Sequence, residues 1–170
     1  MTKRLLLAIT CLLIAPTSVI AETDASQFWA HGFISRLDVA YGGHELQKMD
    51  VYMHGQRVGE PTYFQADNSP RPTLMWIHGG GWIAGDKSSQ VNQLIPYLQR
   101  GWNVFNVNYR QGPGTAPEAV DDVLCAYKAV VAALGDRGQP TNRIVVSGAS
   151  AGGHLSLAVG LLNTTGDHPC

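Results

Sequence analysis

The chain has 170 residues, of which 12 are basic and 13 acidic, so its formal charge is −1; 45% of its residues are hydrophobic and 15% are charged. This composition is that of a globular protein and excludes a disordered, collagen-like or nucleic-acid-binding chain. The length fits one domain with a hydrophobic core.

The first 21 residues have the layout of a secretory signal peptide. Two basic residues precede the apolar run Leu5–Ala15, and small or branched residues stand before a cleavage site after Ala21. A membrane anchor is the alternative, but about eleven apolar residues fall short of the roughly 20 that span a bilayer. We therefore expect removal of residues 1–21, a secreted or periplasmic protein of residues 22–170, and no stable membrane anchor after cleavage.

Strands and helices are predicted to alternate along the rest of the chain. A hairpin is expected from Ile34–Tyr41 and Leu46–Met53, and a loop over Gly55–Pro72. Continuous apolar runs then predict buried strands, and apolar residues at helical spacing predict helices. In chain order these are the strand Thr73–Ile77, the helix Ser88–Arg100, the strand Trp102–Val107, a helix from Pro117 to Gly135, the strand Arg143–Gly148 and the helix Ala151–Leu162. The alternation predicts an α/β fold with a mostly parallel sheet and helices on both faces.

Two cysteines belong to the predicted mature chain, because Cys11 lies inside the signal peptide. In an oxidising compartment Cys125 and Cys170 are candidates for a disulfide. Two buried free thiols are the alternative, and the sequence leaves both readings open.

A serine stands where the last predicted strand passes into a helix, in Gly148-Ala149-Ser150-Ala151-Gly152. On such a sharp turn the serine is exposed above the sheet, and the flanking glycines leave room between strand and helix. The first amides of the helix, including that of Ala151, have no intrahelical acceptor. The pattern favours a nucleophilic serine, and the alternative is a tight turn with an ordinary helix-capping serine.

A second motif, His78-Gly79-Gly80-Gly81-Trp82, follows the strand Thr73–Ile77. Successive glycines leave backbone amides unshielded, and such amides can converge on an oxyanion. A flexible turn and a phosphate-binding loop are the alternatives, but the glycine patterns typical of phosphate loops do not accompany the motif. Found together, each after its own strand and in this order, the two motifs are a specific combination.

At these residues the sequence resembles the α/β-hydrolase superfamily, and within it the HGGG-bearing carboxylesterase and lipase branch, which is similar to hormone-sensitive lipase and to bacterial acetyl and feruloyl esterases. The resemblance begins near Leu37 and implies an α/β-hydrolase fold that is truncated after the helix following the serine. It also implies that Asp122 anchors a helix or loop. The matching residues are the two motifs, Asp50-Val51-Tyr52, Val107-Asn108-Tyr109-Arg110 and Asp122.

The resemblance implies roles for individual residues as well. Ser150 is the expected nucleophile, His78 is expected to orient its loop, and Trp82 is expected to lie near the pocket wall. The oxyanion hole is expected to consist of backbone amides, those of Gly80, Gly81 and Ala151.

Such a hydrolase also needs a histidine that accepts the serine proton and an acid that orients this histidine. His154 lies one helical turn after Ser150, where we expect it to approach from the buried side and to pack within the fold. Asp167 and His168 follow a helix of about twelve residues, which at about 1.5 Å per residue places them some 18 Å away. We therefore expect the triad acid and histidine to lie outside this chain.

The sequence thus predicts the N-terminal part of a secreted serine carboxylesterase that hydrolyses small-molecule carboxylic esters through an acyl-enzyme on Ser150. Alone it is expected to be inactive, and a degenerate relative is the alternative to a fragment. A non-catalytic binding module and an amide hydrolase similar to arylformamidases are the other functions considered. No cofactor, metal or nucleic acid is expected, since the cysteines and histidines form no ligand cluster and the charge is nearly balanced.

Overall fold

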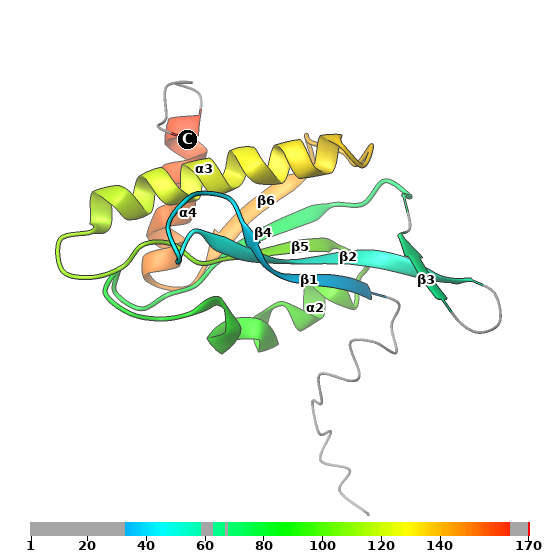
Figure 1. The fold of residues 1–170 in the computed structure, drawn as a ribbon, viewed down its shortest axis with the longest axis horizontal. Coiled ribbons are helices and arrows are strands. Elements are labelled where there is room, and N and C mark those ends of the chain that lie inside the picture. The colour runs from blue at the N-terminus through cyan, green and yellow to red at the C-terminus, as the bar shows by residue number, and fades with distance from the viewer. Residues whose placement is uncertain (1–32, 59–62, 67, 164–169) are drawn as a thin grey trace, which may run out of the picture.

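The computed structural model describes residues 33–58, 63–66, 68–163 and 170, so the predicted signal peptide lies outside the described residues. Figure 1 shows a central sheet with helices on both of its faces. The described elements, in chain order, are β1 (Phe33–Ala40), β2 (Lys48–Val58), β3 (Tyr63–Ala66), β4 (Thr73–Ile77), η1 (Lys87–Gln93, a 3₁₀-helix), α2 (Ile95–Leu98), β5 (Asn103–Val107), α3 (Ala116–Gly135), β6 (Ile144–Gly148) and α4 (Ala151–Leu162).

The sheet has the strand order β1-β2-β5-β4-β6, and β3 pairs with β2 outside this row. β4 runs parallel to β5 and β6, because helical segments connect these strands and return the chain to the same end of the sheet. The pairs β1–β2, β2–β3 and β2–β5 are antiparallel. The described sheet is therefore mixed rather than mostly parallel, because the predicted hairpin joins the parallel part through antiparallel pairing.

β4 and β5 form the interior of the sheet, and this explains why most of their residues are apolar. All five residues of each strand are buried. One face of the sheet packs against α3 and α4 through residues such as Val123 and Leu155, and the other face packs against Leu94 and Leu98. In Figure 1, α3 and α4 lie above the sheet and α2 lies below it. The predicted helical cover on both faces is confirmed.

The two long predicted helices are also confirmed. α4 has the predicted bounds, Ala151–Leu162, and α3 extends from Ala116 to Gly135. Pro117 lies in the first turn of α3, where its missing N–H costs no intrahelical hydrogen bond.

The predicted helix Ser88–Arg100 is instead divided into η1 and α2. Gln90 has non-helical backbone angles, with φ −122° and ψ 17°. Pro96 lies in the first turn of α2, and its ring prevents a helix from continuing through this position. The prediction of one continuous helix was wrong, although Leu94 and Leu98 are buried as its apolar stripe required.

The predicted loop Gly55–Pro72 contains a second hairpin. β2 continues to Val58, and β3 pairs with it in antiparallel register, with Gly55 opposite Ala66 and Val58 opposite Tyr63. Tyrosine and phenylalanine are favoured in strands, and the loop prediction gave too little weight to this preference. The prediction of a loop over the whole segment was therefore wrong.

β6 is an edge strand among the described residues, since it pairs with β4 alone. Its residue Val145 is 44% exposed, and the neighbouring helix α4 exposes Leu157 and Leu161 by 67% and 76%. The apolar sequence of β6 predicts a strand that is buried in a whole domain, and the exposed edge is what we expect of a chain in which no later described strand pairs with its far side. The side of β6 that faces away from β4 is not covered by any described element.

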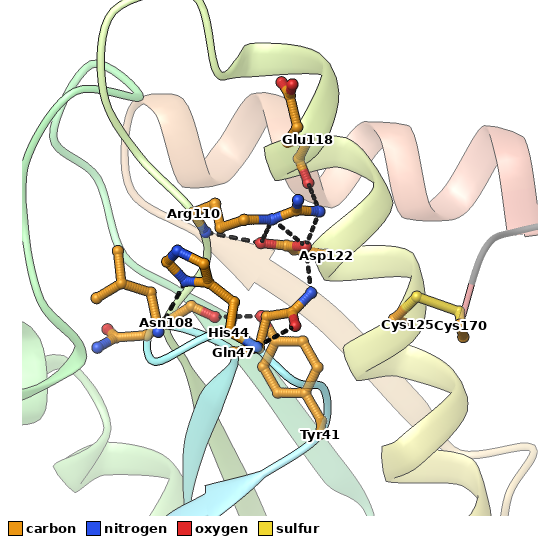
Figure 2. A network of polar contacts seen from close by, with 10 residues as sticks. Tyr41, His44, Gln47, Asn108, Arg110, Glu118, Asp122, Cys125 and Cys170 are labelled. Atoms are coloured by element: carbon orange, nitrogen blue, oxygen red, sulfur yellow. Dashed lines mark hydrogen bonds and ion pairs between the residues drawn. A yellow bond between two sulfur atoms is a disulfide. The ribbon is translucent and has the colours of Figure 1, made fainter.

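A disulfide joins Cys125, which is buried on α3, to Cys170 (Figure 2). The two Cα atoms are 5.4 Å apart and the cysteines are separated by 45 positions in the sequence. In the chain-entropy model, a closed loop of this length contributes about 4 kcal/mol to stability. Of the two readings that the sequence left open, the structure has the disulfide rather than two free thiols.

Candidate active site

The two glycine motifs are in contact because β4 and β6 are parallel neighbours. Ile77, the last residue of β4, pairs with Gly148, the last residue of β6, so the segments that follow both strands leave the same edge of the sheet. The amide of Ala149 donates a hydrogen bond of 3.3 Å to the carbonyl of Ile77. The glycine loop and the serine turn, far apart in the sequence, therefore lie side by side.

Glycines at this contact are required by the close approach of the two backbones. A Cβ atom on Gly79 would lie 2.7 Å from the carbonyl oxygen of Ala149. Cβ atoms on Gly148 and Gly152 would collide with the carbonyl oxygen of Ile77. Since the colliding atoms belong to the backbone, a larger residue at any of these positions would push the two segments apart.

Ser150 is exposed and lies between β6 and α4 with φ 52° and ψ −116°. Residues other than glycine rarely adopt a positive φ, and such strained positions cluster at functional sites. The Ser150 side chain makes no capping hydrogen bond to α4. The alternative of an ordinary helix-capping serine is therefore wrong.

The loop after β4 turns back sharply beside Ser150. Gly80 and Gly81 have φ values of 136° and 63°, and both are exposed. The carbonyl of Gly80 accepts hydrogen bonds from the next turn of the loop, from the amides of Ile83 and Ala84 at 3.2 and 3.1 Å. Ala151 is the first residue of α4, where amides have no intrahelical acceptor. The three predicted oxyanion residues thus lie on the two segments that meet at the serine.

His78 is buried and holds the base of the glycine loop. Its Nδ1 donates to the carbonyl of Gly79 at 2.7 Å, and its ring stacks on Tyr109 with the centroids 4.5 Å apart. The hydroxyl of Tyr109 donates to the carbonyl of His78 at 3.1 Å. Burial lowers the pKa of His78, which favours the neutral ring. Its Nε2 is buried and meets no hydrogen-bond partner in the described part of the chain, Ser150 included.

Trp82 connects the glycine loop to two other segments. It has φ 64°, and its carbonyl accepts a hydrogen bond of 2.9 Å from the amide of Gly112. Its indole contacts the ring of His154 edge to face, with centroids 5.3 Å apart and an angle of 83° between the planes. His154 is exposed. The expectation that it approaches from the buried side was wrong, whereas its packing against another part of the fold is confirmed.

A buried lysine behind the glycine loop was not found from the sequence. Lys87 Nζ lies 2.8 Å from a carboxylate oxygen of Asp38 and 2.9 Å from one of Asp50. Burial alone would lower the pKa of Lys87, but hydrogen bonds from the ammonium group to the two carboxylates outweigh it and raise this pKa. The amide of Lys87 donates to Asn108 Oδ1 at 2.6 Å, which ties the end of the loop to the sheet. Nothing in the sequence distinguishes Lys87 from an exposed lysine.

Figure 2 shows a second polar network, centred on the buried carboxylate of Asp122 on α3. The backbone amide of Arg110 donates to Asp122 at 2.7 Å, and its guanidinium donates through Nη2 at 2.6 Å and through Nε at 3.0 Å. Gln47 Nε2 donates to the same carboxylate at 2.7 Å. Asp122 therefore anchors the segment after β5 and the β1–β2 loop to α3, which is the structural role that the sequence resemblance implies.

Within the described ranges, no group of three or more histidine, cysteine, aspartate or glutamate residues is arranged to hold a metal ion. The same residues include no helix that is both long and apolar enough to cross a membrane.

Comparison with known proteins identifies the family. The BD-FAE family matches residues 62–168 of the sequence, which is more than half of the chain. The chain belongs to this family. It is also 33% identical over 131 residues to esterase LipC of Mycobacterium tuberculosis, and 39% identical over 87 residues to the probable carboxylic ester hydrolase LipM of the same organism. These matches confirm the resemblance to the carboxylesterase branch.

Solved structures confirm the α/β-hydrolase fold of this BD-FAE member. Esterase B from Lactobacillus rhamnosis superposes with a TM-score of 0.60 at 22% identity, covering 76% of this chain and 41% of that one. A putative thioesterase from Silicibacter superposes with a TM-score of 0.58 at 27% identity, covering 78% of this chain and 44% of that one. The chain spans 30% of the length of LipC and 20% of that of LipM, although 76% and 50% of this chain align with them.

Proposed function

We propose that this BD-FAE chain is the nucleophile-bearing part of a secreted serine carboxylesterase that hydrolyses small carboxylic esters. The observation that carries the proposal is Ser150, which is exposed on a strained strand-to-helix turn in contact with a glycine-rich loop. Relatives named esterase and carboxylic ester hydrolase support the reaction class.

In the proposed mechanism Ser150 Oγ attacks the ester carbonyl carbon while a base takes its proton. The negative charge that forms on the carbonyl oxygen is stabilised by the amides of Gly80, Gly81 and Ala151. The tetrahedral intermediate collapses, the alcohol leaves with the proton held by the base, and the acyl group stays on Ser150. Water then attacks this ester and gives one proton to the base, which passes it to Ser150 Oγ as the carboxylic acid and the free serine are released.

The base and the acid that orients it are not assigned to described residues. His78 uses Nδ1 to hold Gly79, and the ring of His154 lies edge-on to Trp82, so neither histidine next to the turn is paired with Ser150. We propose that both groups come from parts of the natural protein outside the described residues.

Covalent labelling tests the nucleophile. The natural full-length protein that carries this chain is treated with an alkyl fluorophosphonate, which phosphonylates activated serines with loss of fluoride. We expect one adduct, on the peptide that contains Ser150, and unchanged labelling of a Ser147→Ala variant, since Ser147 lies on β6 and serves as the matched control. If Ser150 stays unlabelled while the protein is folded, the non-catalytic binding module is the better description.

We also propose export with cleavage after Ala21, on the basis of the basic residues and apolar run at the start of the sequence. N-terminal sequencing of protein recovered from the periplasm or medium should begin at or near Glu22. Recovery of the intact Met1 chain from the cytosol would contradict the export proposal.

A further inference from the structure

Trp82 has a backbone conformation that its own side chain disfavours. A bulky residue at φ 64° is a conformational outlier, and it persists only where surrounding contacts hold it. Gly81, immediately before it, also has a positive φ, so the whole turn from Gly80 to Trp82 lies in conformations that neighbouring contacts must select. The two predicted oxyanion amides of the loop belong to this same turn.

Contacts on two sides hold Trp82 in this conformation. On the backbone side, the amide of Gly112 donates to the Trp82 carbonyl at 2.9 Å. Gly112 itself belongs to the segment that the Arg110–Asp122 network fixes to α3. On the side-chain side, the indole meets the ring of His154 edge to face, an arrangement that aromatic rings prefer.

His154 is positioned by the same turn of helix that carries the serine. It is the fourth residue after Ser150, and its backbone amide donates to the carbonyl of Ser150 at 3.2 Å. The ring therefore extends from the first turn of α4 toward the glycine loop. This ring therefore makes a second contact between the serine turn and the glycine loop, in addition to the close approach of their backbones at Gly79.

We propose that His154 is a positioning residue, whose ring holds Trp82 and thereby fixes the Gly80–Gly81 turn relative to Ser150. The inference rests on the proposed function, since it assigns His154 a role in that reaction. The ring acts by its shape and its edge-to-face contact and transfers no proton. Because His154 is exposed, its replacement removes this contact without opening a cavity in the core.

Three substitutions in the natural full-length protein distinguish a role of the His154 ring from a role of His154 in proton transfer. His154→Phe keeps an aromatic ring but has no nitrogen, His154→Gln keeps polar atoms but has no ring, and His154→Ala has neither. We expect His154→Gln and His154→Ala to lower kcat by about 10-fold to 100-fold, the size of effect that a small misplacement of reacting groups produces. KM should change little, and His154→Phe should restore most of kcat.

Leu157→Ala is the matched control, because Leu157 is exposed on the same helix three residues further on and makes no part of the contact. It should leave kcat and KM unchanged. A substitution of Trp82 by alanine should lower kcat to a similar extent, and adding His154→Ala to it should lower kcat little further, since both changes remove one contact.

Two results would overturn the inference. If His154→Phe is as inactive as His154→Ala, the ring nitrogen is needed and His154 takes part in proton transfer. If all three variants keep full kcat, the contact does not position the loop. Fluorophosphonate labelling of Ser150 in the unsubstituted protein separates both results from a failure of the proposed function, because that labelling does not depend on the role of His154.

Discussion

Replacing Ser150 with alanine in the natural full-length protein will lower kcat for a short-chain aryl ester by a factor on the order of 10⁶. The reason is that the proposed acyl-enzyme can no longer form, while the proposed oxyanion amides remain. The measurement is release of the phenolate by absorbance. Ser147→Ala should retain full activity. Substantial turnover by the Ser150→Ala protein would show that another residue is the nucleophile.

Ser150→Gly should lose activity to the same extent as Ser150→Ala, but only the glycine variant should be more stable than the unsubstituted protein. With φ 52° and ψ −116°, Ser150 has backbone angles that cost a residue other than glycine about 1–3 kcal/mol. Glycine adopts these angles without that cost, so Ser150→Gly should increase the free energy of unfolding, whereas Ser150→Ala should not. Urea denaturation followed by circular dichroism measures both. If the glycine variant is no more stable than the alanine variant, the turn stores no strain.

Elements with a regular pattern of apolar residues were predicted well from the sequence. β4 is apolar from Leu74 to Ile77 because both faces of the strand are buried, and α3 shows a clear apolar stripe between Pro117 and Gly135. β3 and the divided helix after Asp86 were not predicted. β3 depends on pairing with β2, which periodicity does not report. The divided helix follows from the turn at Gln90 and from the ring of Pro96, which the prediction from helical spacing did not take into account.

The same distinction applies to the site. Ser150 and the glycine loop were proposed from the sequence because glycine spacing reports directly on close backbone approach, which the contacts of Gly79, Gly148 and Gly152 bear out. Lys87 and the contact between Trp82 and His154 were not foreseen. Both join residues from different elements, and no spacing along the chain indicates such pairs.

We expect the carboxylate of Asp122 to contribute more to the free energy of unfolding than any other polar side chain described. This carboxylate is buried, with 1% of the side chain exposed, and it accepts hydrogen bonds from both the backbone and the guanidinium of Arg110 and from Gln47. Asp122→Ala would remove the acceptor for all of these donors, and it would leave the Arg110 guanidinium, whose side chain is 32% exposed, without its counter-charge.

We therefore expect Asp122→Ala to lower the free energy of unfolding by about 3 kcal/mol, the low end of the range for a buried pair that loses one partner, because water reaches Arg110. Asp121→Ala is the matched control, since Asp121 is the preceding residue of α3, is half-buried and takes no part in these hydrogen bonds. Urea denaturation of the natural protein measures both changes.

Asp122→Asn tests whether the charge of the side chain is needed in addition to its shape. The asparagine keeps one acceptor oxygen but turns an NH₂ group toward other donors, so this variant should lose nearly as much stability as Asp122→Ala. If it stays as stable as the unsubstituted protein, the charge of Asp122 does not hold the segment after β5 to α3.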